Sequence, residues 1–404
     1  MTRSIVLVMA FLTALTLHLL LFSYSAMIPH IIEEMKISHA EAGLIFSACI
    51  IAIIVLRIPW GLLSDRLGFT ATMKLAMTLV AIFSLLRGVS TDYYTLMACQ
   101  LLLGIGFAAI LPCLAKIVNV MFREKAGSAT GIYVSGFPTG EILGLSLTSQ
   151  LLLALHGDWR FVFLMLGVWS TILAALWLAM PKESLGKQTY PNSQLVVSLR
   201  RLIRTRDVWM LIGLCICSMG CYDTLLTWLL HMIALSGMSS IEASVIASAF
   251  PLGFLAAGLV VGTLSDKVGL RRPFIWTLGL AGGGLIMLIP YATWLSLLGT
   301  VLLSGFALSG ILTMVLVIPT EHPEMSGFAG GVVGLVFSLG NIGTFLFPIV
   351  VGFLIDITGS PMPPLIVLAI VCAATAVPGL GISETGRAGL SATPPAHPPV
   401  EQVS

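Results

Sequence analysis

The stretch GLLSDRLG at residues 61–68 returns as GTLSDKVG at residues 262–269, which is an offset of 201 positions. Each copy follows a long apolar run and has Gly first, Asp fifth, a basic residue sixth and Gly last. A second region agrees at an offset of 200 positions, in the pairs Gly127 and Gly327, Gly131 and Gly331, and Gly140 and Gly340. Two separate regions with nearly one offset indicate that the chain is a duplicated unit.

The composition indicates that this duplicated chain lies in a membrane. Of the 404 residues, 57% are hydrophobic and only 9% are charged, with a mean hydropathy of +1.03, whereas soluble domains carry about 25% charged residues. The net charge of +2 is too small to suggest a nucleic-acid partner. The seven cysteines are scattered through apolar segments, so we interpret them as small buried side chains, not as a disulfide framework or a metal site.

Apolar runs divide the whole chain into spans of about the length that a bilayer requires. We find twelve of them, at about residues 5–28, 42–63, 73–90, 94–118, 127–155, 161–180, 208–235, 242–263, 274–291, 294–318, 327–355 and 362–382. They predict an all-α membrane protein with twelve transmembrane helices. Because six spans per copy is an even number, both copies cross the membrane in the same direction, as two parallel pseudo-symmetric six-helix bundles.

The breaks between the runs predict the domains and the orientation. We expect an N-terminal bundle at 1–180, a cytoplasmic central loop at 181–206, a C-terminal bundle at 207–382 and a disordered cytoplasmic tail at 383–404. Lys and Arg gather on the side that holds both termini, and the loops opposite hold only Lys36 and Arg160. The positive-inside rule therefore places both termini in the cytoplasm, with the protein in the plasma (inner) membrane.

Twelve spans, a long middle loop and a Gly-x3-Asp-[Arg/Lys]-x-Gly motif in both halves resemble the major facilitator superfamily of secondary transporters. The resemblance covers about residues 1–382. The first copy departs from the family pattern at Phe69 and Thr70, where a basic pair is usual, and the second copy keeps Arg271 and Arg272. The resemblance implies two bundles that rock about a central solute site. Because one chain contains both halves, we expect it to work as a monomer, and we expect no cofactor.

Charged residues near the two motifs are expected to hold the cytoplasmic side closed. A glycine allows a neighbouring helix to approach, an aspartate can face the positive N-terminus of that helix, and the basic residue can pair with an acid of the other half. We assign this gating role to Gly61, Asp65, Arg66, Asp266, Arg123 and Glu321. The alternative is a solvated loop that only sets the topology.

Arg57 is the most unusual residue of the second span. It lies eight residues before Asp65, which is about 12 Å of helix. A charge at that depth is costly in lipid and usually faces a polar interior, and the planar guanidinium suits a carboxylate or another oxyanion. We expect Arg57 to bind an anionic solute; the alternative is a permanent pair with a buried acid such as Glu141 or Asp223. Arg87 and Lys116, near opposite membrane boundaries, are expected to snorkel.

The sequence RIP at 57–59 also resembles the second span of nitrate/nitrite porters, in which the arginine binds the anion. The resemblance is partial, because the position equivalent to Arg57 in the second half is Gly258 and the eighth span contains no arginine. The sequence GNIG at 340–343 matches the Gly-Asn-x-Gly signature of those porters, but the fifth span has Glu141 where an asparagine is expected. A single arginine with nearby acids indicates a carboxylate or another small anion taken up with a proton.

Other polar residues at membrane depth complete the predicted site. Glu141 and Asp223 are the candidate proton carriers, because burial favours the protonated form of an acid. His18 and Asn341 are expected to supply hydrogen bonds to the solute, although His18 could equally bond within the bundle. The predicted substrate-binding residues are Arg57, His18, Tyr24, Asn341 and Trp228.

The sequence predicts a proton-coupled secondary transporter, by symport of a small organic or inorganic anion, that works by alternating access. A first alternative is a proton-coupled exporter of an uncharged or cationic compound, with the acids in direct contact with it. A second is a membrane sensor that binds a solute without moving it, but residues 181–206 and 383–404 are too few for a signalling domain. No catalytic grouping, phosphate loop or metal motif indicates an enzyme.

Overall fold

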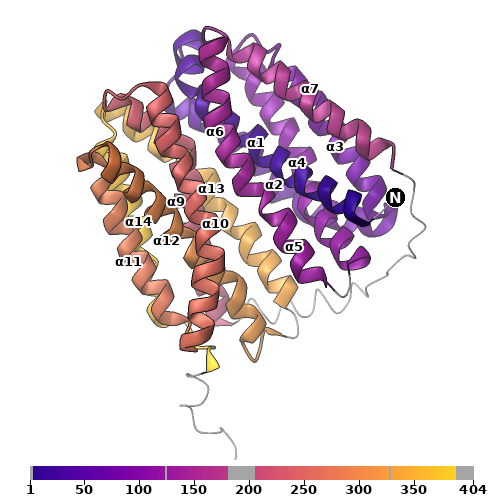
Figure 1. The fold of residues 1–404 in the computed structure, drawn as a ribbon, viewed down its shortest axis with the longest axis vertical. Helices are drawn as coiled ribbons and strands as arrows, with labels where there is room; N and C mark the ends of the chain where they lie inside the picture. The colour runs from indigo at the N-terminus through magenta and orange to yellow at the C-terminus, as the bar shows by residue number, and fades with distance from the viewer. Residues whose placement is uncertain (1–2, 123–124, 181–204, 327–328, 388–404) are drawn as a thin grey trace, which may run out of the picture.

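The computed structural model describes residues 3–122, 125–180, 205–326 and 329–387. All regular elements in this part of the chain are helices, and they form two halves that lie side by side (Figure 1). The N-terminal half runs from indigo to magenta in Figure 1, and the C-terminal half runs from salmon to yellow. Arg123, Gly327, residues 181–204 of the predicted central loop and residues 388–404 of the predicted tail lie outside the described residues.

The helices follow one another in the order that the apolar runs predict. The N-terminal half contains α1 (Arg3–Met35), α2 (His39–Leu67), α3 (Phe69–Arg87), α4 (Tyr93–Met121), α5 (Ala126–Val134), α6 (Gly136–Ala154) and α7 (Trp159–Leu178). The C-terminal half contains α9 (Arg206–Leu235), α10 (Ser240–Val268), α11 (Arg272–Leu288), the short η2 (Ile289–Tyr291), α12 (Trp294–Glu321), α13 (Ala329–Thr358), α14 (Met362–Ala374) and α15 (Ala376–Gly381).

The predicted twelve spans are confirmed, and one of them is divided. Eleven helices in the described part of the chain are long and apolar enough to cross a membrane. The remaining span consists of α5 and α6, which meet at Ser135. Pro138 lacks the backbone N–H that would bond to the carbonyl of Val134 in a continuous helix, so the chain breaks one turn before the proline.

The duplication is also visible in how equivalent helices begin. At the start of α2, Ser38 and Glu41 form a capping box, in which each side chain bonds to the backbone N–H of the other residue. Ser239 and Glu242 form the same box at the start of α10, again 201 positions later. Each box satisfies N–H groups that have no partner within the helix, so both halves begin their second span by the same local chemistry.

Helix packing repeats in the two halves and joins them symmetrically. Helix α1 packs against α6 as α9 packs against α13, and between the halves α2 packs against α13 as α6 packs against α10. Two glycines allow the closest approaches. A Cβ on Gly140 of α6 would lie 2.2 Å from the Leu15 carbonyl oxygen, and one on Gly343 of α13 would lie 2.1 Å from that of Ile216. Only glycine fits at such contacts between membrane helices.

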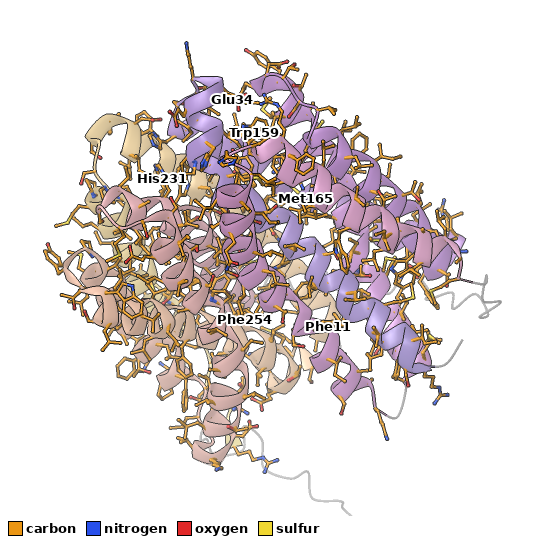
Figure 2. The ribbon with its side chains drawn as sticks, turned by 45° about the horizontal axis from the view of Figure 1, so that its top comes forward. Phe11, Glu34, Trp159, Met165, His231 and Phe254 are labelled. Carbon is orange, nitrogen blue, oxygen red and sulfur yellow. The ribbon has the colours of Figure 1, made fainter. Side chains whose placement is uncertain are left out.

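The two ends of the bundle are joined to different degrees. We call the end with Gly68 and Gly269 the motif end, and the end with the α1–α2 turn at Lys36 the opposite end, where Trp159 donates a hydrogen bond of 2.6 Å to Glu34 (Figure 2). Among the described residues, polar contacts between the halves occur only at the centre and the opposite end. Within the described ranges, the halves are therefore held together by polar contacts at the centre and the opposite end, and none of these contacts lies at the motif end.

Glycines in the last turns toward the motif end support this difference. A Cβ added to Gly61 of α2, Gly131 of α5 or Gly331 of α13 would meet no atom within 4 Å. By contrast, a Cβ on Gly352 of α13, at the opposite end, would lie 2.3 Å from the His39 carbonyl oxygen of α2. The structure is thus closed at the opposite end and more open at the motif end.

The first residues of the predicted disordered tail are ordered in the structure. The carboxylate of Glu384 accepts hydrogen bonds from the backbone N–H groups of Arg271, at 2.7 Å, and Arg272, at 3.1 Å. A carboxylate at the positive N-terminus of a helix is favourable, so residues 383–386 are fixed to the start of α11. The composition of the tail did not indicate this contact, because it depends on one acid among many small residues.

Candidate transport site

Glu141 is the centre of a buried polar cluster that joins both halves. It lies on α6 directly after Gly140, and only 2% of its surface is exposed. One carboxylate oxygen is 2.6 Å from Nδ1 of His18 on α1. The other accepts a hydrogen bond of 2.8 Å from the hydroxyl of Tyr222 on α9. The structure therefore brings together two predicted site residues, Glu141 and His18, and adds one that the sequence did not single out.

Asp223 extends the cluster along α9. It follows Tyr222, is 8% exposed, and accepts a hydrogen bond of 2.7 Å from the hydroxyl of Thr344 on α13. It lies close enough to Glu141 to interact with it electrostatically. Asn341 lies one turn before Thr344 and donates a hydrogen bond of 2.6 Å to the Phe337 carbonyl. Both candidate proton carriers thus lie in one buried cluster, each with a defined hydrogen-bond partner.

Arg57 lies in the same interior and is not paired with either acid. Its Nε is buried and has no hydrogen-bond partner among the described residues, and within that part of the chain its terminal nitrogens form no hydrogen bond or ion pair. The guanidinium lies near Cys215 of α9, in the other half. The alternative of a permanent pair with Glu141 or Asp223 is therefore not what the structure shows.

The relation of Arg57 to the acids follows from α9. Cys215 precedes Asp223 by eight residues on this helix, which is about 12 Å along its axis. Arg57 thus lies about two turns nearer to the motif end than the acid cluster. A solute that enters from the more open end would meet an unpaired guanidinium first and the carboxyl groups beyond it.

Tyr24 and Trp228 have roles in packing that differ from the predicted contact with a solute. Tyr24 is fully buried, and its hydroxyl donates a hydrogen bond of 2.8 Å to the Ala42 carbonyl on α2. Trp228 is also fully buried and donates a hydrogen bond of 3.0 Å to the Pro348 carbonyl on α13. Each polar group is already used between neighbouring helices of one half, so neither is available to a solute in this state.

The predicted gating residues of the first half are paired within that half. Asp65 accepts a hydrogen bond of 2.6 Å from Lys116 on α4, and Lys116 also donates to the Gly61 carbonyl at 2.9 Å. Lys116, which was expected to snorkel, thus reaches defined polar partners at the motif end. Arg66 is exposed next to this pair.

The gating residues of the second half form an equivalent but larger cluster. Arg271 bonds at 2.6 Å to Asp266 and at 2.6 Å to Glu321 on α12. The hydrogen bonds that Arg271 donates to Glu321 raise the pKa of Arg271 above its ordinary value, so this cation stays charged. Because the motif end is the more open one here, contacts across the halves at that end remain a prediction for another state.

The chain matches a known family over nearly its whole length. A profile described as Major Facilitator Superfamily matches residues 8–342 and 230–402. Among solved structures, the nucleoside transporter NupG superposes with a TM-score of 0.76 over 93% of this chain and 99% of that one, at 14% identity. A bacterial homolog of the human lysosomal transporter Spinster, in an inward-facing and unoccupied conformation, has a TM-score of 0.70 over 94% and 95% of the two chains, at 17% identity.

Curated relatives are more similar in sequence. The probable galactarate/D-glucarate transporter GudP of Bacillus subtilis is 26% identical over 375 residues, or 81% of this chain and 80% of that protein. The 3-(3-hydroxy-phenyl)propionate transporter of Escherichia coli is 25% identical over 80% and 79% of the two chains. The gentisate transporter of Corynebacterium glutamicum is 23% identical over 80% and 74%. The partial resemblance to nitrate/nitrite porters is thus replaced by similarity to transporters named for organic acids.

Proposed function

Because the chain belongs to the Major Facilitator Superfamily, we propose that this secondary transporter carries a small organic anion together with a proton by alternating access. The unpaired guanidinium of Arg57 carries this proposal. Buried polar groups are almost always hydrogen-bonded in folded proteins, whereas Nε of the half-buried Arg57 side chain is a buried donor without a partner, which is costly. A site that leaves such a cation unpaired when empty gains free energy when an anion completes it.

A carboxylate is the anion that suits Arg57 best. A carboxylate can accept two parallel hydrogen bonds from the fork of the guanidinium, an interaction about twice as strong as a neutral hydrogen bond. The names of the relatives above include glucarate, hydroxyphenylpropionate and gentisate, which are all organic acids. These two observations favour an organic carboxylate over nitrate, for which the expected second arginine is replaced by Gly258.

The acid cluster of Glu141 and Asp223 binds the transported proton. Glu141 contacts His18 of the first half and Tyr222 of the second, so its charge acts on the contact between the halves. An anion brought to Arg57 places further negative charge near Glu141 and Asp223, which favours uptake of a proton by one of them. A proton bound with the anion also limits the net charge that crosses the low-dielectric interior.

The orientation follows from the charge distribution and stays part of the proposal. The motif end faces the cytoplasm of the plasma (inner) membrane, and the opposite end faces outward. One chain contains both halves of the site and therefore acts as a monomer. The alternative of a cation exporter is less well supported, since Glu141 and Asp223 already accept hydrogen bonds from His18, Tyr222 and Thr344.

Uptake into proteoliposomes tests the proposal. Labelled D-glucarate, gentisate, 3-(3-hydroxyphenyl)propionate, nitrate and a neutral sugar would be compared with and without an inward proton gradient. We expect the gradient to stimulate uptake of at least one organic acid. Arg57→Gln should weaken its binding by about 10- to 100-fold, from the loss of about 1.5–3 kcal/mol of charge-assisted hydrogen bonds.

The matched control is Arg3→Gln, which removes an exposed positive charge at the first turn of α1. It should leave uptake unchanged. Anion uptake that survives in Arg57→Gln at the wild-type apparent affinity would contradict the role of Arg57. Uptake of the neutral sugar alone would contradict the anion class, and anion uptake indifferent to the gradient would contradict the coupling.

A further inference from the structure

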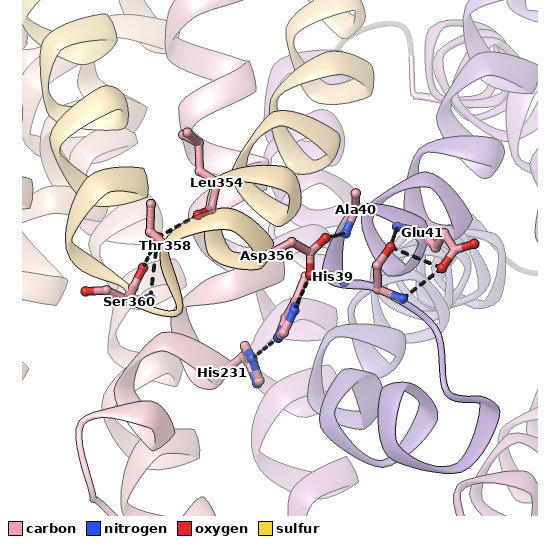
Figure 3. Close-up of polar contacts among 9 residues, drawn as sticks. His39, Ala40, Glu41, His231, Leu354, Asp356, Thr358 and Ser360 are labelled. Atoms are coloured by element: carbon pink, nitrogen blue, oxygen red, sulfur yellow. Dashed lines mark hydrogen bonds and ion pairs between the residues drawn. The ribbon is translucent and has the colours of Figure 1, made fainter.

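A cluster at the opposite end joins the halves through ionisable groups that the transport site does not use (Figure 3). Asp356 of α13 accepts hydrogen bonds from the backbone N–H of His39 at 2.8 Å, from that of Ala40 at 2.9 Å and from Nδ1 of His39 at 2.7 Å. This carboxylate of the C-terminal half therefore caps the first turn of α2 in the N-terminal half. A negatively charged carboxylate at this position is favourable, because the N-terminus of a helix is partially positive.

The same His39 ring meets a second histidine. Its Nε2 lies 3.1 Å from Nε2 of His231 on α9, and the two ring centres are 5.0 Å apart. Because Nδ1 of His39 donates to Asp356, the Nε2 of a neutral His39 is an acceptor. His231 then donates its Nε2 proton to His39. The contact requires that one of the two facing nitrogens carries no proton.

We propose that His39 and His231 form a second proton-binding site, which keeps the opposite end closed until both rings are protonated. A histidinium carries N–H on both ring nitrogens. When both rings are charged, two N–H groups face each other at hydrogen-bond distance with no acceptor between them, and the like charges repel. The contact is then lost, and the two helices that it joins are released from each other.

The surroundings of the pair support this function. Among the described residues, the charged group in contact with it is Asp356; Glu41, two residues after His39, bonds to Ser38 instead. The His39 and Asp356 side chains are each 24% exposed, so protons from the adjacent solution reach them. The halves are in van der Waals contact here, since a Cβ on Gly43 would lie 2.5 Å from the Pro348 carbonyl oxygen. Because His39 lies on α2 and His231 on α9, loss of the pair removes one of the two side-chain hydrogen bonds of His39 with the C-terminal half, and the other is its hydrogen bond to Asp356 of α13.

The role of this site in transport rests on the proposed function. With the opposite end facing outward, an acidic exterior would release the pair and open the end through which the anion enters. The proton that drives the solute would thus also favour the state that accepts it. The binding of protons by the pair, however, does not depend on any solute.

The test measures opening of the opposite end without solute or gradient. Spin labels at cysteines introduced by Glu33→Cys on α1 and Ser240→Cys on α10 report the distance between the halves, because both positions are exposed at this end. The half-buried Cys99 and Cys217 would be replaced by serine. We expect one short distance at pH 8 and an additional, longer distance at pH 5.

Two variants make the pair insensitive to pH. In His231→Gln the amide can donate to His39 or, after rotation, accept from it, so the contact persists in both protonation states. This variant should keep the short distance at pH 5, and His39→Gln should likewise abolish the response. His156→Asn is the matched control: it removes an exposed histidine of the same end, at a φ of 53° that asparagine tolerates, and it should respond like the wild type.

A wild-type distance that is the same at pH 8 and pH 5 would overturn the proposal, as would a normal response in both glutamine variants. Thermal unfolding of each variant shows whether it folds, and either glutamine variant is sufficient. Because neither solute nor gradient is used, a failure here is distinct from a failure of anion uptake in proteoliposomes.

Discussion

Arg57 and Arg87 are two arginines inside apolar helices of the same half, and their surroundings differ. Arg87 ends α3 and is fully buried; one terminal nitrogen donates to the Leu20 carbonyl and to Gln100, each at 3.0 Å, and its guanidinium lies 4.3 Å from the centre of the Phe163 ring. Arg57 has no such partner among the described residues, although Nε of both side chains is unpaired. The expectation that Arg87 snorkels to the boundary was wrong.

The difference indicates that Arg87 stabilises the helix bundle, whereas Arg57 is available to bind a ligand. Arg87 links α3 to α1, α4 and α7, and its hydrogen bonds and its ring contact compensate for part of the cost of burying it. Arg57 links no helices in this state. Depth in the membrane makes any charge notable, but the presence or absence of protein partners decides which function it has.

The largest expected effect is on the stability of Arg87→Met. This change removes one of the donors to the Leu20 carbonyl, which still accepts from Ser23, and leaves the buried Oε1 of Gln100 without its donor. Each loss costs about 1–3 kcal/mol. We expect the purified protein to lose about 3 kcal/mol of unfolding free energy in total. Arg57→Met should leave stability unchanged or raise it, because no protein hydrogen bond is lost. Denaturant or thermal unfolding in the same detergent compares the two variants.

A loss of stability in Arg57→Met as large as that in Arg87→Met would remove the distinction, since it would show that Arg57 is also part of the scaffold. Measurements of anion uptake separate the role in ligand binding from the role in stability. Arg57→Met should fold normally and fail to accumulate the anion, whereas Arg87→Met should retain the substrate preference of whatever fraction stays folded.

The sequence was sufficient for the fold but only for part of the site. Composition, the repeat at 61–68 and 262–269 and the even number of spans predict two parallel bundles, and the structure confirms them. Arg57 and Glu141 stand out because ionisable groups are rare at membrane depth. The partners of Glu141 could not be predicted, because His18 lies 123 positions and Tyr222 lies 81 positions away along the chain.

Residues at helix starts were the most difficult to interpret. His39 belongs to an ordinary capped helix start, and its contact with Asp356 joins residues 317 positions apart. The partners of Tyr24 and Trp228 could not be predicted for a different reason: a polar aromatic side chain in a span can line a polar interior or bond to a neighbouring carbonyl. Only the packing of α1 on α2 and of α9 on α13 decides between these two roles.

Tyr222→Phe tests the hydrogen-bond partner of Glu141, and its expected effect is intermediate in size among these predictions. The hydroxyl donates to Glu141, which stabilises the ionised carboxylate. Without that donor Glu141 holds its proton more tightly, so the pH profile of anion uptake should move to higher pH by about one unit, the equivalent of one charge-assisted hydrogen bond. The profile is measured at a fixed gradient. Tyr133→Phe is the control, because it removes the hydroxyl of a buried tyrosine of α5 that forms no hydrogen bond with Glu141 or Asp223.

A profile that does not move in Tyr222→Phe would show that Glu141 is not the group whose protonation limits uptake. Asp223, whose donor is Thr344, would then be the candidate. Thr344→Val would be expected to produce the shift in its place, since valine has a similar volume and no hydroxyl.

The smallest expected effect is that of Lys116→Met, which removes a cation that has partners but lies near the surface. The Lys116 and Asp65 side chains are 31% and 42% exposed, and ion pairs of this kind contribute about 0–1 kcal/mol. We therefore expect stability to fall by less than about 1 kcal/mol, well below the effect of Arg87→Met. A loss of stability in Lys116→Met as large as that in Arg87→Met would mean that hydrogen bonding alone, irrespective of burial, makes a cation part of the scaffold. The lack of a hydrogen-bond partner would then be the sole basis for assigning Arg57 to ligand binding.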